Sequence, residues 1–179
     1  MMDAFYNKDV TKIEAEVNTG SLIDYLIVDM IMGEHDHHSK SFNMYYTNTS
    51  SDDENGKLSF GPIWDYDWSL NVNWTGTPNE IFEISNEMFY SNIFFEAMRD
   101  IPEYYEQIKI RYNEYGKVAL ANYIVELDTI VASMEESLYL NHKKWYSAYS
   151  TDITSKNIKF LKDYLQSRKT QLDSVWTLE

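Results

Sequence analysis

The sequence has 179 residues, of which 44% are hydrophobic and 16% aromatic, and its formal net charge is −14 at pH 7. This length and composition argue for one globular domain with a single core and against a disordered chain. The excess of acidic groups would repel a phosphate backbone, so we expect no nucleic-acid partner. Because the chain contains no cysteine, disulfides, thiolate metal sites and a cysteine nucleophile are excluded.

The sequence shows neither a membrane span nor an export signal. Its longest apolar run covers residues 25–28, far short of the roughly 20 residues that cross a bilayer. No cationic segment followed by an apolar one stands at the N-terminus, so no signal peptide is visible.

The first predicted element is a helix over residues 21–32, "SLIDYLIVDMIM". Ser21 is a suitable N-cap, and Gly33 is a suitable stop for the last turn. Only Asp24 and Asp29 interrupt the apolar surface of this segment, so we expect a central, mostly buried helix.

A polar loop follows this helix, and it contains three of the four histidines of the chain. His35, Asp36, His37 and His38 stand together in the stretch "MGEHDHHSKSFNMYY". A metal site, a catalytic loop and a solvated turn would each explain such a cluster.

Two aromatic-rich segments then predict a β-hairpin. They are "SFNMYY", residues 41–46, and "KLSFGPIWDYDWSL", residues 57–70. The pair Asn55-Gly56 between them is a strong signal for a hairpin turn. The sequence therefore predicts a small two-stranded ribbon placed directly after the histidine loop.

Asp65 and Asp67 lie two residues apart in the second predicted strand. Side chains two apart in a strand project from the same face, so these carboxylates should share a face and repel each other unless a cation lies between them. Oxygen ligands favour Mg²⁺ or Mn²⁺ over zinc. A solvent-facing strand with two acids is the alternative.

The remainder of the chain has helical periodicity. Proline at position 102 begins one predicted helix, and Gly116 is expected to end it. Three apolar stripes are predicted to face the core; they comprise Met88, Phe89, Ile93, Phe94, Ala97 and Met98; Leu120, Ile124, Leu127, Val131, Met134, Leu138 and Trp145; and Ile158, Leu161, Leu165, Leu172 and Trp176. The expected fold is therefore α+β and mainly α-helical, with a small hairpin among helices.

The order of these acidic residues suits phosphoryl transfer. In such sites one aspartate orients the acceptor hydroxyl, a second holds the metal on the phosphates, and an amide or hydroxyl completes the metal shell. Asp36, Asp65, Ser41 and Asn43 could fill these roles, and we expect the carboxylates of Asp36 and Asp65 to approach within about 10 Å.

At these segments the sequence resembles the CotH kinase family, the spore-coat-type atypical protein kinases. The resemblance rests on "SLIDYLIVDMIMGEHDHHSKSFNMYY" and "GKLSFGPIWDYDWSL", and it continues in "FFEAMRDIPEYYEQIKIRYNEY", "NHKKWYS" and "NIKFLKDYLQSRKTQLDSVW". It covers nearly the whole chain from about Ile13, and it implies the C-terminal lobe of a protein-kinase-like fold.

The resemblance implies a role for each candidate residue. Asp36 matches the catalytic aspartate of the family, Asp65 matches its metal-binding aspartate, and Asp67, at a position that is often but not always acidic, is expected to help bind the metal. Lys40 would lie near the transferred phosphoryl group and neutralise charge there. Many members carry asparagine where this chain has Ser41, and Asn43 could share its cofactor-binding role. The implied cofactors are ATP and Mg²⁺ or Mn²⁺, and the implied partner is a protein with a Ser or Thr acceptor.

The resemblance also implies what to expect of the whole protein. A kinase needs a glycine-rich loop and a lysine for its nucleotide, and the six glycines of this chain form no such loop. We therefore expect residues 1–179 to be a single C-terminal lobe, a piece of a longer protein whose N-terminal ATP lobe is missing here. The family resemblance implies an extracellular, cell-surface or spore-coat location.

Two other functions remain open from the sequence. A zinc hydrolase could use His35, His37 and His38 with Asp36 or Asp65 as ligands, although the remaining His142 lies far along the chain. A non-catalytic surface or scaffold module could instead bind a protein or glycan through its tyrosine-rich, acidic face.

Overall fold

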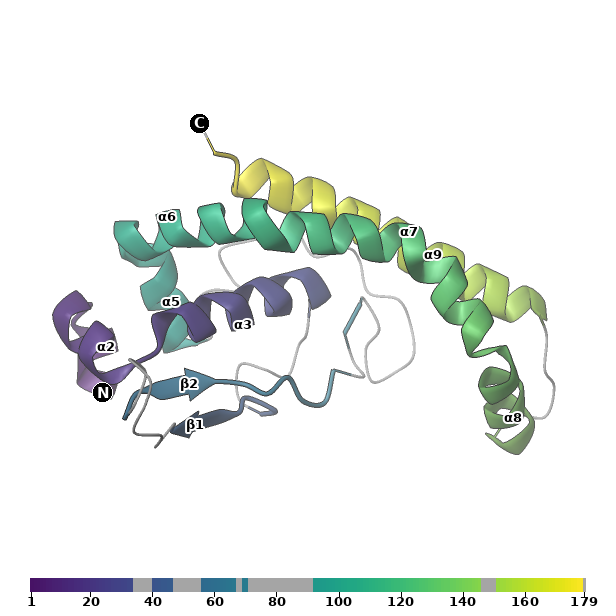
Figure 1. The fold of residues 1–179 in the computed structure, drawn as a ribbon, viewed down its shortest axis with the longest axis horizontal. Helices are drawn as coiled ribbons and strands as arrows, with labels where there is room; N and C mark the ends of the chain where they lie inside the picture. The colour runs from purple at the N-terminus through teal and green to yellow at the C-terminus, as the bar shows by residue number, and fades with distance from the viewer. Residues whose placement is uncertain (34–39, 47–55, 67–68, 71–91, 146–150, 179) are drawn as a thin grey trace.

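The computed structural model confirms the predicted mainly helical α+β fold (Figure 1). It describes residues 1–33, 40–46, 56–66, 69–70, 92–145 and 151–178, with the side chains of 151–156 left aside. Its elements are α1 (Met2–Tyr6), α2 (Val10–Glu16), α3 (Thr19–Met32), β1 (Met44–Tyr46), β2 (Leu58–Phe60), α5 (Ile93–Asp100), α6 (Pro102–Arg111), the π-helix η1 (Tyr112–Gly116), α7 (Lys117–Ser133), α8 (Glu135–Trp145) and α9 (Thr151–Val175).

Helix α3 is the central element. It lies between the hairpin on one side and the long helices α6, α7 and α9 on the other (Figure 1), and it contacts β2, α5, α6, η1 and α9. The predicted burial is confirmed, because its apolar residues Leu22, Leu26 and Met30 are fully buried. Its end at Gly33 is also confirmed, since Gly33 adopts a left-handed backbone with φ of 63°.

The start of α3 differs from the prediction. Asn18, and not Ser21, is the N-cap, because the Asn18 side chain accepts a hydrogen bond from the Ser21 amide at 3.1 Å. The hydroxyl of Ser21 instead joins the helix to the hairpin, since it accepts a hydrogen bond from the Phe60 amide at 3.0 Å. Ser21, which was predicted to cap the helix, therefore connects α3 to β2 by a hydrogen bond.

The hairpin is confirmed, but its strands are much shorter than predicted. β1 and β2 pair antiparallel, with Met44 opposite Phe60 and Tyr46 opposite Leu58. The segment after β2 is not a strand at Asp65, whose φ of 63° is left-handed. Ser41 has a similar φ of 55°, so the strand predicted over residues 41–46 is wrong at its start and begins only at Met44.

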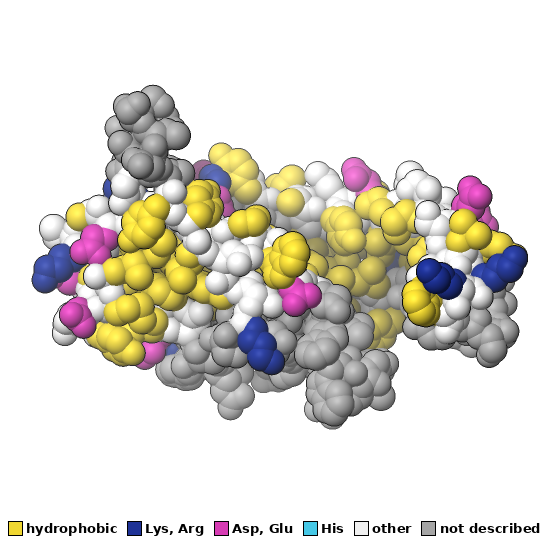
Figure 2. All heavy atoms as spheres, turned by 90° about the horizontal axis from the view of Figure 1, so that it is seen from below, with side chains coloured by type: hydrophobic (Ala, Val, Ile, Leu, Met, Phe, Trp, Pro, Cys, Tyr) yellow, Lys and Arg dark blue, Asp and Glu magenta, His cyan; other side chains and the backbone are white. Residues whose placement is uncertain are grey.

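The hairpin buries one strand and exposes the other. All of β2 is buried, whereas the side chains of β1 are 42% to 62% exposed at Met44, Tyr45 and Tyr46. Ile63 and Trp64 on the following segment are exposed as well. Figure 2, a view from below, shows hydrophobic side chains gathered on this face of the molecule.

Two predicted helix boundaries are wrong. Gly116 ends nothing, because its φ of −60° is helical and η1 passes directly into α7. A Cβ atom at Gly116 would lie 3.0 Å from the Ile27 side chain, so this glycine allows the close approach of α3. The long helix expected over residues 120–145 is two helices, α7 and α8, separated at Met134.

The core of the described residues comprises a large cluster built from α1, α2, α3, β2, α5, α6, η1 and α9, and a smaller cluster of Leu120, Tyr164 and Leu165 between α7 and α9. The expected core positions Phe94, Ala97, Met98, Leu120, Leu127, Leu165, Leu172 and Trp176 are buried. Met134 and Trp145 are 43% and 67% exposed, so their predicted burial is wrong; α8 has no buried residue because it extends past the body of the molecule (Figure 1). Met88 and Phe89 lie outside the described residues.

Candidate functional site

The structure brings two of the predicted site residues together. The Ser41 hydroxyl donates a hydrogen bond to Oδ2 of Asp65 over 3.3 Å, across 24 residues of sequence. Both residues have left-handed backbones, a conformation that aspartate tolerates better than most residues. Ser41 comes just before β1 and Asp65 follows β2, so the hairpin carries them to the same place.

An aromatic cluster fixes the position of Ser41. The next residue, Phe42, packs edge-on against Tyr25 and Phe60, with ring centroids 5.0 and 5.5 Å apart, and it stacks on Phe94 at 5.8 Å. The Tyr25 hydroxyl also donates to the Ser41 carbonyl oxygen at 3.4 Å. Aromatic pairs of this kind add about 0.5–1.5 kcal/mol each beyond their buried area, so the backbone at Ser41 is well held.

Asn43 braces the segment that leads to Asp65. Its side-chain amide donates to the Pro62 carbonyl oxygen at 3.4 Å, and its carbonyl oxygen accepts from the Gly61 amide at 2.9 Å. Both partners precede Asp65 by a few residues, so Asn43 holds the backbone that leads to the carboxylate. The predicted cofactor-binding role of Asn43 stays a prediction.

Of the other predicted site residues, the structure describes Lys40 but not the rest. Lys40 is exposed and directly precedes Ser41. Asp36 and Asp67, together with His35, His37 and His38, lie outside the described residues. The expected approach of Asp36 to Asp65 therefore stays a prediction. The segment that carries Asp36 follows Gly33 and precedes Lys40, both of which are described.

The chemistry of the described donors fits a hard cation. Asp65 is exposed and offers carboxylate oxygens, and Ser41 offers a hydroxyl oxygen beside it. Mg²⁺ prefers oxygen ligands and keeps several waters, so it is commonly held by one or two carboxylates. Among the residues that the structure describes, no group of three His, Asp or Glu side chains could hold a metal ion.

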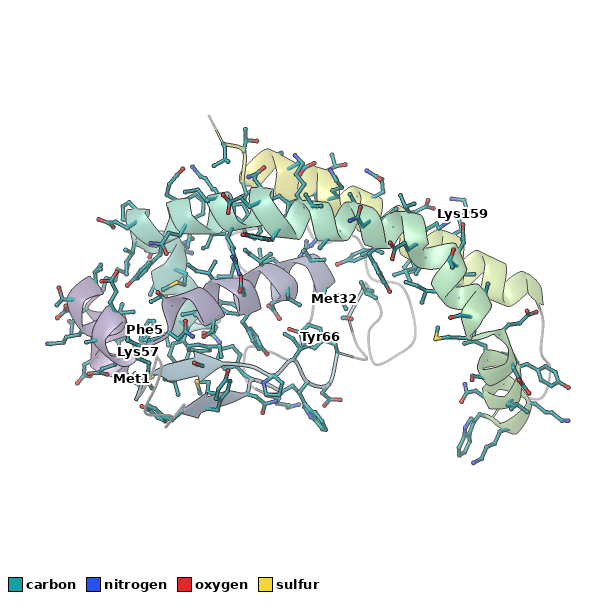
Figure 3. The ribbon with its side chains drawn as sticks, viewed as in Figure 1. Met1, Phe5, Met32, Lys57, Tyr66 and Lys159 are labelled. Carbon is teal, nitrogen blue, oxygen red and sulfur yellow. The ribbon has the colours of Figure 1, made fainter. Side chains whose placement is uncertain are left out.

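The end of α3 contacts residues that follow Asp65. The Tyr66 hydroxyl donates to Oδ1 of Asp29 at 3.4 Å, and the Leu70 amide donates to the Met32 carbonyl oxygen at 2.7 Å. Figure 3 shows Tyr66 beneath the end of α3, where Met32 lies. Sequence reasoning missed these supports, although Asp29 gave a signal as a carboxylate on an apolar helix that proves fully buried.

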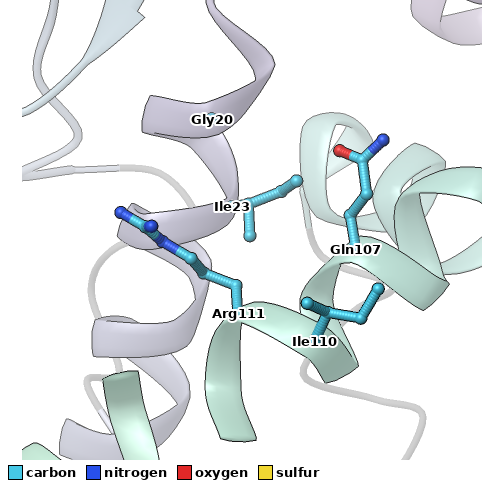
Figure 4. Close-up of a pocket in the computed structure, with 5 residues that line it drawn as sticks. All are labelled: Gly20, Ile23, Gln107, Ile110 and Arg111. Carbon is cyan, nitrogen blue, oxygen red and sulfur yellow. The ribbon is translucent and has the colours of Figure 1, made fainter. Parts of the chain in front are cut away.

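A hollow of about 340 Å³ lies elsewhere, beside α3 and α6 (Figure 4). Gly20, Ile23, Gln107, Ile110 and Arg111 line it. The Arg111 guanidinium makes two hydrogen bonds to the Asp24 carboxylate, at 2.7 and 2.9 Å. None of the predicted site residues that the structure describes lines this hollow, and Arg111, the charged residue among the described lining, is already paired.

Comparison with known proteins gives one match. The model of a protein family described as CotH kinase protein matches residues 3–172 of this chain. No curated protein and no solved structure matches it.

Proposed function

Because the chain belongs to the CotH kinase family, we propose that it forms the metal-binding and catalytic lobe of a protein kinase. The reaction is phosphoryl transfer from ATP to a Ser or Thr hydroxyl of a protein. The contact between Ser41 and Asp65 carries this proposal, because it joins a hydroxyl and a carboxylate from two separate segments where the family resemblance requires cofactor and metal ligands.

The residues divide the work as follows. Asp65, with Asp67 and Ser41 or Asn43, would hold Mg²⁺ or Mn²⁺, which when bound supplies positive charge to the phosphates. Asp36 orients the acceptor hydroxyl and takes its proton. The hydroxyl oxygen forms the new bond to the γ-phosphorus while the bond from that phosphorus to the β–γ bridging oxygen breaks, and ADP leaves. Lys40 neutralises charge that develops on the transferred group.

The partner and the location follow from the family. A protein with a Ser or Thr acceptor is the proposed substrate, and a spore coat or cell surface is the proposed location. None of the helices in the described part of the chain is long and apolar enough to cross a membrane. The net charge of −14 favours basic or neutral acceptor surfaces over acidic ones.

Metal binding tests the proposed site and separates it from a zinc hydrolase. The free Mn²⁺ signal in electron paramagnetic resonance measures how much metal the chain binds. We expect weak Mn²⁺ binding that Mg²⁺ displaces and that Asp65→Asn abolishes, while Asp128→Asn, at an exposed carboxylate on α7, leaves it unchanged. Equal Mn²⁺ binding by Asp65→Asn and the unmodified chain would refute the proposed site. Tight zinc binding lost in a His35→Ala, His37→Ala variant would favour the hydrolase.

A non-catalytic binding module is the second candidate function. The exposed aromatic side chains Tyr45, Tyr46 and Trp64 favour it, because exposed rings beside an acidic group suit stacking on a protein or glycan. This function predicts a partner bound through β1 and no transfer of phosphate even when metal and ATP are bound.

A further inference from the structure

Three side-chain and backbone donors meet the carbonyl groups at the end of α3. Nε of Arg168 donates to the Met30 carbonyl oxygen at 2.5 Å, and the Tyr164 hydroxyl donates to the Met32 carbonyl oxygen at 3.3 Å. The Leu70 amide donates to that same Met32 oxygen at 2.7 Å. Two of the donors come from α9, more than 130 residues along the chain from their acceptors.

The last carbonyls of a helix have no partner within the helix, and their partial negative charge attracts cations. Arg168 meets this need from a fully buried position. Gly33 lets α9 come close, because a Cβ atom there would overlap the Tyr164 hydroxyl. The end of α3 is thus capped by another helix instead of by water.

The same place holds the segment that carries Asp65. The Tyr66 ring, one residue from Asp65, reaches the Asp29 carboxylate in the last part of α3. Leu70 shares its acceptor, the Met32 oxygen, with Tyr164. Tyr66 and Leu70 are therefore both attached to the helix end that α9 caps.

The charges in this cluster are complementary. Asp29 and Arg168 are both fully buried. Burial lowers the pKa of the Arg168 guanidinium, and Tyr164 and the Asp29 carboxylate oppose this lowering. Burial raises the pKa of Tyr164, so its hydroxyl keeps its proton and remains a donor. Buried charges of this kind are strongly destabilising when one partner is removed.

We propose that Tyr164 and Arg168 are positioning residues, which hold Tyr66 and Leu70 against the end of α3 and thereby set the affinity of the metal site at Asp65. The attachment of Tyr66 and Leu70 to α3 is given by their hydrogen bonds to Asp29 and Met32. The consequence for metal rests on the proposed function, because the site at Asp65 is itself proposed. Tyr164 and Arg168 donate to the Met32 and Met30 carbonyl oxygens, so their effect on Asp65 passes through the end of α3.

A matched pair of tyrosine variants tests the inference. Tyr164→Phe removes the hydroxyl that donates to Met32. Tyr112→Phe removes another buried hydroxyl that also faces α9, where it donates to Oδ1 of Asp173 at 3.0 Å, away from Asp65. Hydrogen exchange of the Leu70 amide, measured by NMR, reports the attachment directly, and Mn²⁺ titration reports the site.

We expect Tyr164→Phe to lower the protection of the Leu70 amide about fivefold, as loss of one hydrogen bond would. Its Mn²⁺ dissociation constant should rise roughly tenfold, the lower end of the effect of removing supporting partners of metal ligands. Tyr112→Phe should change neither, even if it lowers the melting temperature equally. Arg168→Lys, which keeps the charge but loses the fork of donors, should act in the same direction as Tyr164→Phe.

The inference is overturned if the Leu70 amide is equally protected from hydrogen exchange in Tyr164→Phe and Tyr112→Phe. It is likewise overturned if Tyr164→Phe changes only the melting temperature. It is also overturned if Leu70 loses protection while Mn²⁺ binding stays at the level of the unmodified chain. If the unmodified chain and Asp65→Asn bind Mn²⁺ alike, the proposed function fails, and the Leu70 amide alone then decides whether α9 holds this segment.

Discussion

Gly33 shows how one residue connects the helical core to the proposed site. Its left-handed backbone ends α3 with a hydrogen bond from its own amide to the Asp29 carbonyl oxygen at 2.8 Å. The missing side chain leaves room for the Tyr164 hydroxyl. Two independent requirements, a positive φ and a close neighbour, therefore fall on the same glycine.

We predict that Gly33→Ala lowers the free energy of unfolding by about 2 kcal/mol, because the left-handed backbone alone costs an L-residue about 1–2 kcal/mol and Tyr164 must also move. Gly20→Ala is the matched control in the same helix. Its backbone is helical and its added Cβ would lie 3.4 Å from the nearest atom, Oδ1 of Asn18. It should be neutral or stabilising by up to about 1 kcal/mol.

Urea unfolding followed by circular dichroism measures both variants. Equal stabilities for Gly33→Ala and Gly20→Ala would mean that the helix end and Tyr164 are not in contact.

The proximity of Ser41 and Asp65 could be predicted, whereas their backbone geometry could not. Ser41 and Asp65 were expected in one site because a hairpin separates them, and the structure brings them into contact. The strand conformation predicted for both residues is wrong, since both have positive φ values. Side-chain periodicity assumes regular backbone, and nothing in the residue types of this segment announces a left-handed aspartate.

Among the helices, boundaries were predicted correctly where local backbone preferences determine them. Pro102 begins α6 and Gly33 ends α3, as predicted from proline and glycine preferences. The prediction that Gly116 ends a helix was wrong, because the glycine is explained by tertiary packing against Ile27 and not by helix termination. The predicted burial of Trp145 was wrong for a related reason: α8 has the apolar spacing of a helix, but none of its residues is buried.

The N-terminal helices α1 and α2 were not predicted, and an ion-pair group ties this region to α5. Asp100 accepts hydrogen bonds from Nε of Arg99 at 2.5 Å and from Nζ of Lys8 at 2.7 Å. These cations, Arg99 above all, lower the pKa of Asp100 from 3.8 to about 2 against the opposing effect of burial. Lys8 lies 92 residues away in sequence, so no local pattern could reveal it.

This pKa shift predicts a pH dependence of stability. The carboxyl binds protons less readily in the folded protein, so its contribution is present above about pH 4 and is lost as pH falls toward 2. We expect Asp100→Asn to lower the free energy of unfolding at pH 7 by about 1–2 kcal/mol, allowing for partial solvent screening, and to have little effect near pH 2.

The control is Asp128→Asn, which removes an exposed pair between Asp128 and Lys162 and should cost less than about 1 kcal/mol. Urea unfolding at a series of pH values checks both. A stability loss for Asp100→Asn that stays constant from pH 7 to pH 2 would show that charge is not the cause.

At the scale of the whole molecule, α3 joins the parts. It lies between the hairpin and the layer of α6, α7 and α9 (Figure 1), and its C-terminal end leads toward the segment that carries Asp36. The amphipathic pattern predicted this mixture of helices and a hairpin. Periodicity could not reveal that α9 returns to cap α3, because that contact depends on chain topology.

The family also sets an expectation for nucleotide binding. Kinase catalysis depends mostly on positioning and electrostatics, so aspartates without a phosphate cradle hold ATP poorly. We propose that residues 1–179 fold alone but bind ATP·Mg weakly, and that the natural full-length protein binds it well. Isothermal titration of both with ATP·Mg compares the affinities directly.

Transfer of radiolabel from γ-labelled ATP to protein measures whether this lobe performs phosphoryl transfer. We expect transfer by the natural full-length protein, loss of at least roughly 100-fold in Asp36→Ala, as removal of a general base produces, and ATP·Mg binding that survives this change. Asp128→Asn should transfer normally. An inert full-length protein that still binds metal and ATP, or an Asp36→Ala variant with full activity, would refute the proposed function.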